Sequence, residues 1–105
     1  MDYFNNNIFN SADENEKTFK EPSDTDILTG GFTLILFNDE HHSFEEVILQ
    51  VMKATGFTPE KATTITFEAH NKGRATVMTG NLNKCFRAQV ILEEIGLRTS
   101  LEVNS

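Results

Sequence analysis

The chain has 105 residues, which is enough for one domain with a hydrophobic core but not for two. Its net charge of −7 argues against nucleic acid and anionic membranes as main partners, and no apolar run approaches the ~20 residues of a membrane span. With one cysteine and no recognisable signal peptide, the protein is expected in the reducing cytoplasm, without an internal disulfide.

The first part of the chain differs in composition from the rest. Residues 1–27 are rich in asparagine and acidic side chains and carry a net charge of −5, against −2 for residues 28–105. They show neither a helical nor a strand period, so we expect a disordered acidic N-terminal tail followed by a folded domain over residues 28–105. The simplest role is a solvated leader, while apolar residues between Tyr3 and Phe9 leave open a segment that orders on a partner.

The folded part begins with a strand and a helix. Phe32–Phe37 (FTLILF) is apolar on both faces, which predicts a central or well-covered strand. A polar turn at residues 38–40 ends it. Ser43 then begins a helix, because Glu46 completes a capping box and apolar residues follow at helical spacing up to Gly56.

Four further elements complete the predicted domain. A second helix starts at Thr58, which precedes a proline, and ends at Gly73. Residues 74–79 predict a strand, residues 81–95 a helix, and the alternation in residues 97–103 a half-buried strand. The predicted fold class is α/β: a small two-layer α/β sandwich of order β-α-α-β-α-β, with a three-stranded sheet and helices on one face. The relative direction of the first two strands stays open.

Few residues suggest chemistry directly, since the chain has no P-loop, dinucleotide fingerprint, HExxH or CxxC motif. Cys85 lies on the apolar stripe of a predicted helix, which favours a packing role over a nucleophilic pair with His70. A polar cluster follows the first strand, and its simplest interpretation is a turn with capping side chains. A metal site is the weaker alternative, and would need several of these side chains to converge: Asp39, Glu40, His41, His42 and His70.

The same residues carry a resemblance to a known family. An apolar strand runs into Asn38-Asp39-Glu40, the second helix holds Lys61-Ala62-Thr63 after a glutamate, and His70 is followed by Gly73-Arg74. In these motifs and their spacing the sequence resembles the ClpS family, adaptors of the AAA+ protease Clp. The resemblance covers residues 32–103 and is most specific up to residue 75.

The resemblance implies a function as well as the predicted fold. ClpS adaptors recognise N-degrons, meaning proteins that begin with Phe, Tyr, Trp or Leu, and deliver them to the ClpA or ClpC unfoldase. The resemblance therefore implies a monomeric adaptor that is not an enzyme and needs no cofactor or metal. It assigns the binding of the substrate's amino group to Asn38, Asp39 and His70, whose oxygen and nitrogen atoms are the acceptors that an ammonium group requires.

The resemblance also assigns a hydrophobic pocket for the substrate's first side chain. It would be lined by Ile35 or Leu36 of the strand and by Phe44, Thr66, Ala69 and Leu97. Phe44 and Thr66 replace methionines that are usual in the family, and Ala69 replaces a valine. The two smaller residues enlarge the pocket floor, whereas Phe44 is either a stiff gate to the pocket or a core residue of the first helix.

Contact with the unfoldase is the last implied property. Asn81 and Phe86 stand where the family has an acid and a lysine, and Lys84 and Arg87 lie nearby as candidate contacts. These departures motivate an alternative, a protein-binding module of the same fold that does not act with Clp. An enzyme that uses the histidines or Cys85 is a third possibility.

Overall fold

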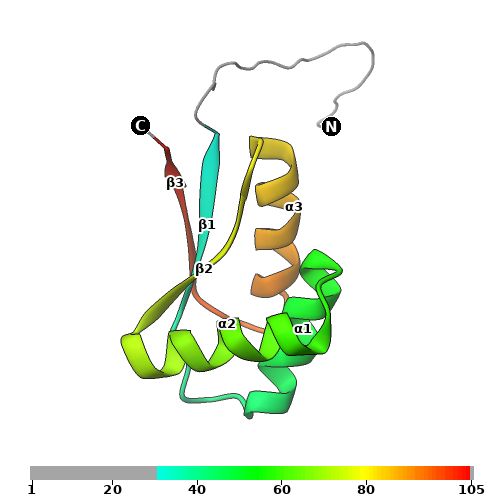
Figure 1. The fold of residues 1–105 in the computed structure, drawn as a ribbon, viewed down its shortest axis with the longest axis vertical. Helices are drawn as coiled ribbons and strands as arrows, with labels where there is room; N and C mark the ends of the chain where they lie inside the picture. The colour runs from blue at the N-terminus through cyan, green and yellow to red at the C-terminus, as the bar shows by residue number, and fades with distance from the viewer. Residues whose placement is uncertain (1–30, 105) are drawn as a thin grey trace. The chain divides into compact units, whose positions relative to one another are not determined.

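The computed structural model describes residues 31–104, and its elements follow the predicted order β-α-α-β-α-β (Figure 1). The strands are β1 (Phe32–Phe37), β2 (Arg74–Gly80) and β3 (Thr99–Val103). The predicted tail over residues 1–27 lies outside the described residues. Within residues 31–104, none of the helices has the length and apolar character to cross a membrane.

The three strands form one sheet in the order β2-β1-β3, so the apolar strand β1 is central, as predicted. Both pairings are antiparallel, which determines the direction that the sequence leaves open. The pairing of β1 with β2 contains an irregularity after Leu34, because Leu34 lies opposite Met78 while Ile35 lies opposite Thr76. The extra residue on β2, Val77, is therefore typical of a β-bulge.

The three helices are α1 (Phe44–Thr55), α2 (Pro59–Lys72) and α3 (Leu82–Glu93). The capping box of α1 is present, since Ser43 N donates to Glu46 Oε1 at 2.8 Å and Glu46 N donates to Ser43 Oγ at 3.1 Å. Helix α3 ends at Glu93, two residues before the predicted end. Its chain tightens there into shorter turns, with Glu94 N donating to the carbonyl oxygen of Ile91 and Gly96 N to that of Glu93.

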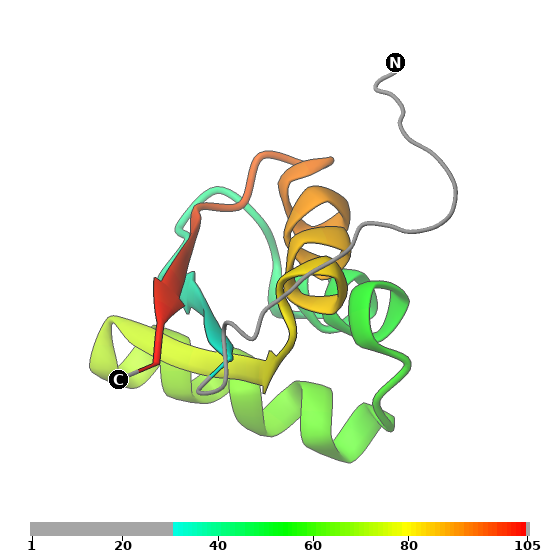
Figure 2. The same cartoon turned by 90° about the horizontal axis from the view of Figure 1, so that it is seen from above.

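The helices cover one face of the sheet, and the core lies between the two layers (Figure 2). Leu34 and Leu36 of β1 belong to this core, and the other largest fully buried side chains are Val51, Cys85 and Leu92. The predicted two-layer α/β sandwich is confirmed. Burial raises the pKa of the Cys85 thiol, which disfavours the thiolate that a nucleophile requires and agrees with a packing role.

Candidate functional site

One backbone contact joins the end of β1 to the end of α2. Gly73 ends α2 with a φ of 89°, a conformation that glycine adopts without steric cost, and its N–H donates to the carbonyl oxygen of Ala69 at 2.9 Å. The carbonyl oxygen of Gly73 then accepts a hydrogen bond from Asn38 N at 3.0 Å. As a result, Asn38 after β1 and His70 in the last turn of α2 belong to the same region of the surface.

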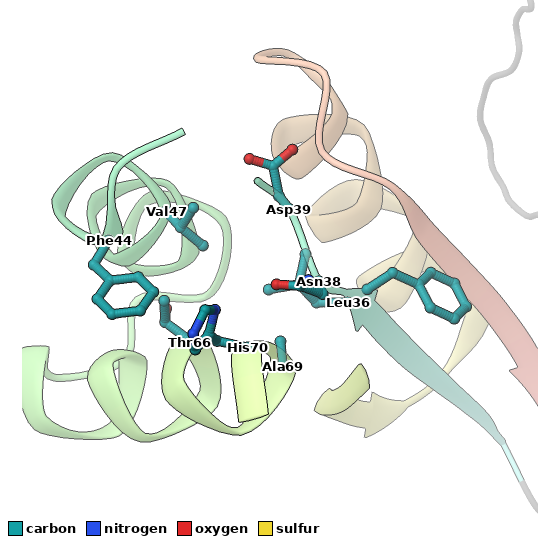
Figure 3. A pocket seen from close by; sticks show the side chains of 9 residues that line it. Leu36, Asn38, Asp39, Phe44, Val47, Thr66, Ala69 and His70 are labelled. Carbon is teal, nitrogen blue, oxygen red and sulfur yellow. The ribbon is translucent and has the colours of Figure 1, made fainter. Parts of the chain in front are cut away.

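A pocket lies in this region, between the end of β1, the start of α1 and the last turns of α2 (Figure 3). The pocket is open to solvent, and the empty space among its lining atoms, open solvent included, is about 240 Å³. Its walls combine apolar side chains with a polar rim, and the lining residues are Leu36, Phe37, Asn38, Asp39, Phe44, Val47, Thr66, Ala69 and His70.

Most of the predicted site residues meet in this pocket. The amino-group residues Asn38, Asp39 and His70 all line it, and so do four predicted wall residues, Leu36, Phe44, Thr66 and Ala69. The remaining two lie elsewhere. Ile35 is only 4% exposed and lies outside the core between the layers, on the opposite side of β1 from Leu34 and Leu36, while Leu97 is 2% exposed within that core.

Two lining residues, Phe37 and Val47, are absent from the sequence-based prediction. Val47 follows Phe44 by three positions on α1, and residues at this spacing share one face of a helix. This spacing is a signal that could have identified it. Phe37 lies at the end of β1, where the Arg74 and Arg98 guanidinium groups lie 5.6 and 5.1 Å from the centroid of its ring.

The apolar wall of the pocket is made mainly by α1 and α2. Thr66 and Ala69 are buried on α2, and the Thr66 hydroxyl donates to the carbonyl oxygen of Ala62 at 2.9 Å. Because this donor is used within the helix, the Thr66 side of the pocket offers no hydroxyl hydrogen to a ligand. The pocket floor is thus suited to an apolar side chain.

Phe44 forms the wall on the side of α1. Its ring contacts Phe67 edge to face, with centroids 4.6 Å apart and an interplanar angle of 64°. It contacts the His70 ring in the same manner, at 5.1 Å and 80°. Phe44 is partly exposed and is not a member of the buried core, so the structure places it at the pocket and not in the core of α1.

The polar rim contains hydrogen-bond acceptors that the described residues leave available, among them one on Asn38 and those of His70. The Asn38 amide donates through Nδ2 to Glu40 Oε2 at 3.4 Å, which leaves its Oδ1 oxygen as an acceptor. His70 is exposed, and within residues 31–104 neither of its ring nitrogens takes part in a hydrogen bond. Figure 3 shows the His70 ring beside the Phe44 ring, and the Asn38 side chain across from Phe44 at the end of β1.

Asp39 plays a structural part in the loop that leads to α1. Its Oδ2 accepts hydrogen bonds from His41 N at 3.0 Å and from His42 N at 2.7 Å, and it lies 2.8 Å from His42 Nδ1. Burial raises the pKa of the Asp39 carboxyl, but the hydrogen bonds from His42 and His41 outweigh this and hold it below its usual value. The hydrogen bond with Asp39 raises the pKa of His42.

The alternative interpretations of the polar cluster receive no support from the geometry. Within residues 31–104, no three His, Cys, Asp or Glu side chains come together as metal ligands would. His42 is instead paired with Asp39. Cys85 does not line the pocket that contains His70.

The residues that were expected to contact an unfoldase lie on α3, which contributes no side chain to the pocket. Lys84 and Arg87 are exposed there. The same helix exposes a row of apolar side chains at four-residue spacing: Leu82, Phe86 and Val90.

Comparison with known proteins agrees with this arrangement. Residues 30–100 match the model of a family described as "ATP-dependent Clp protease adaptor protein ClpS". The chain belongs to the ClpS family. Over 79 residues, 73% of its length, it is also 30% identical to E3 ubiquitin-protein ligase UBR2 of Mus musculus and of Homo sapiens. The ClpS-like chain spans only 4% of the length of these relatives.

Proposed function

We propose that this ClpS-family protein is a cytoplasmic adaptor that recognises N-degrons and delivers the proteins that carry them to the ClpA or ClpC unfoldase of the Clp protease. One observation carries the proposal: the pocket combines an apolar floor with the acceptors of Asn38 and His70 at its rim. A protein that begins with a bulky apolar residue offers the complementary pair, an apolar side chain beside a free ammonium group.

The amino group is the part of the substrate that the rim would bind. An N-terminal ammonium group has three donor hydrogens, and Asn38 Oδ1 and a neutral His70 nitrogen supply two acceptors. Asp39 adds negative charge next to them, and its Oδ1 accepts no hydrogen bond from residues 31–104. Because acetylated or internal residues lack the ammonium group, they leave these acceptors without a partner and are rejected.

The first side chain of the substrate would fill the apolar part of the pocket. Full burial of a large apolar side chain contributes ~1.5–3 kcal/mol, and each charge-assisted hydrogen bond adds a similar amount. Together they correspond to dissociation constants on the order of micromolar. Phe44, next to His70, would close the wall on the side of α1 and restrict the shape of the side chain that enters.

Delivery is the second half of the proposal. Lys84 and Arg87 are suitable for contact with the unfoldase, because they are exposed on a helix that takes no part in the pocket. The adaptor could therefore hold a substrate and an unfoldase at the same time. Residues 1–27 are assigned to delivery and not to peptide binding. The similarity to part of a ubiquitin ligase supports a role in choosing proteins for degradation.

A peptide titration tests the binding half. Peptides that are identical except for a free or an acetylated amine, and for Phe, Leu, Ile or Gly as first residue, are titrated against the full chain by fluorescence anisotropy. We expect the free-amine Phe peptide to bind and the acetylated and Gly-initiated peptides to bind at least ~10-fold more weakly. Equal binding of the free and acetylated forms would contradict N-degron recognition.

A second candidate function follows from the exposed apolar row on α3. Phe86 stands where the family has a lysine toward its unfoldase, and Leu82 and Val90 extend an exposed apolar row on both sides of it. This surface favours a protein-binding module that does not act with Clp. Binding of the full chain to purified ClpA and ClpC separates the two. Peptide binding without affinity for either unfoldase favours this second candidate.

A further inference from the structure

An exposed aromatic side chain lies beside the pocket without lining it. Phe67 on α2 is 42% exposed, and its ring centroid lies 4.6 Å from that of Phe44. Phe44 in turn contacts His70, so the three rings form a continuous series from the amino-group rim outward. The exposed part of the Phe67 ring is apolar surface in contact with water, and with Phe44 beside it this surface adjoins the candidate binding pocket.

The position of this surface matches one part of an N-terminal peptide. When the amino group lies at Asn38 and His70 and the first side chain fills the pocket, the second residue lies at the rim, because consecutive Cα atoms are 3.8 Å apart. Because Phe44 lines the pocket and Phe67 lies next to it, a large side chain at that second residue is long enough to reach the Phe44–Phe67 surface. A glycine at the same position leaves the surface exposed.

We propose that Phe67, together with Phe44, forms a subsite that favours a large apolar side chain at the second residue of the substrate. This inference rests on the proposed N-degron binding and specifies its substrate class. With this subsite the adaptor recognises two residues of the substrate. The first side chain binds in the pocket, and the second binds on the ring surface outside it.

The polar neighbours of Phe67 agree with an apolar ligand and not an acidic one. One turn earlier on α2, the Thr63 and Thr64 hydroxyls donate to backbone carbonyl oxygens of the same helix at 2.7 and 3.1 Å. They therefore offer no donor to a carboxylate. The neighbouring charged residue, Glu68, is acidic and exposed, and would repel an acidic second residue.

The test varies the second residue while the first remains phenylalanine. Free-amine peptides that begin Phe-Leu or Phe-Gly, and are otherwise identical, are titrated against the full-length wild type, Phe67→Ala, Phe67→Leu and Phe86→Ala. The acetylated Phe-Gly peptide is titrated against the wild type as well. Phe86 is the matched control, because it is a phenylalanine on α3, 53% exposed and outside the pocket. Since the subsite buries part of a side chain, we expect the wild type to prefer Phe-Leu by about three- to tenfold.

The variants give distinct outcomes. Phe67→Ala should reduce the preference to less than about twofold by weakening Phe-Leu alone, while Phe67→Leu and Phe86→Ala should keep most of it. A wild type that binds both peptides equally, or a preference that persists in Phe67→Ala, would overturn the subsite but leave N-degron binding intact. A wild type that does not distinguish free from acetylated Phe-Gly would overturn both.

Discussion

The rings of Phe44 and His70 meet edge to face, 5.1 Å between centroids, at the point where the first turn of α1 faces the last turn of α2. Phe44 belongs to the apolar wall of the pocket, and His70 to its polar rim. The contact thus joins the part that would receive a side chain to the part that would receive an amino group. A test of His70 therefore needs two variants, one that removes both the acceptor and the ring contact and one that removes the acceptor alone.

Replacement of His70 should weaken the binding of free-amine peptides. We expect His70→Ala and His70→Phe each to lose about ten- to a hundredfold in affinity, the equivalent of a charge-assisted hydrogen bond of ~1.5–3 kcal/mol. His70→Phe keeps a ring against Phe44 but has no acceptor nitrogen. His41→Ala, a histidine that does not line the pocket, is the matched control. The measurement is peptide titration, with circular dichroism to verify folding.

The two His70 variants distinguish the roles of this side chain. If His70→Phe binds like the wild type while His70→Ala does not, the ring contact matters and the acceptor does not. Wild-type affinity in both variants would contradict the proposed contact of His70 with the amino group.

The order of the elements and the central place of β1 could be predicted, because each depends on local patterns. FTLILF is apolar on both faces, which is typical of a central or well-covered strand, and β1 is the central strand of the sheet. The antiparallel direction could not be predicted, because a helix pair can connect β1 and β2 in either direction. The end of α3 at Glu93 could not be predicted, because the apolar period continues to Ile95, past the turn where the hydrogen bonding changes.

Less of the site than of the fold could be predicted from the sequence. Asn38 and His70 lie far apart in the sequence. The pairing of Phe37 with Arg74 and the hydrogen bond from Asn38 N to Gly73 make them neighbours. The choice between Ile35 and Leu36 as a wall residue depends on which face of β1 meets the helices, and Leu36 shares that face with the core. Phe67 could not be predicted as part of the site, because it lies beside the apolar stripe of α2 and is exposed.

The Asp39–His42 pair predicts a dependence of stability on pH. The folded-state pKa of Asp39 lies below its usual 3.8, so its contribution is present above that value and is lost as the pH falls through the folded-state pKa. The folded-state pKa of His42 lies above 6.5, so its contribution is complete below 6.5 and is lost as the pH rises through the folded-state pKa. The free energy of unfolding in urea should therefore show a decrease from pH ~6 to pH ~8 that depends on His42.

Two variants test the origin of this decrease. His42→Gln keeps a hydrogen-bond donor for Asp39 but does not titrate, and it should remove the decrease, whereas His41→Gln should retain it. In addition, Asp39→Asn should lower the pKa of His42 measured by NMR, because the partner that stabilises the protonated ring has lost its charge. An unchanged His42 pKa in Asp39→Asn would contradict the pairing.

Charge reversal on α3 should separate delivery from peptide binding. We expect Lys84→Glu combined with Arg87→Glu to weaken binding to ClpA or ClpC by roughly tenfold at low salt, with a smaller effect at high salt, where the attraction is screened. Peptide affinity should not change, because neither side chain lines the pocket. Lys61→Glu, which reverses an exposed charge on α2, is the control. If the double variant binds the unfoldase as tightly as the wild type does, the contact does not lie on this face of α3.

The smaller residues of the pocket floor predict a preference for rings. Thr66 and Ala69 provide less side-chain volume than the methionine and valine usual in the family, so Phe or Trp should fill the space that Leu leaves empty. We expect Phe- and Trp-initiated peptides to bind more tightly than Leu-initiated ones, and Ile or Val to bind poorly against the stiff Phe44 wall. Each missing or extra methylene changes binding by ~1–3 kcal/mol, so competition between peptides that differ only in the first residue will measure the preference.

Restoring the family's larger side chains provides the decisive comparison. Thr66→Met with Ala69→Val fills the floor, so it should weaken Trp- and Phe-initiated peptides and bring Leu level with them or above. Thr64→Met, on the exposed side of α2, adds the same side chain outside the pocket and should leave the order unchanged. A wild type that prefers Leu would refute the enlarged floor. If Ile binds as well as Phe, Phe44 is not the gate, because a branch at Cβ then meets no obstacle beside it.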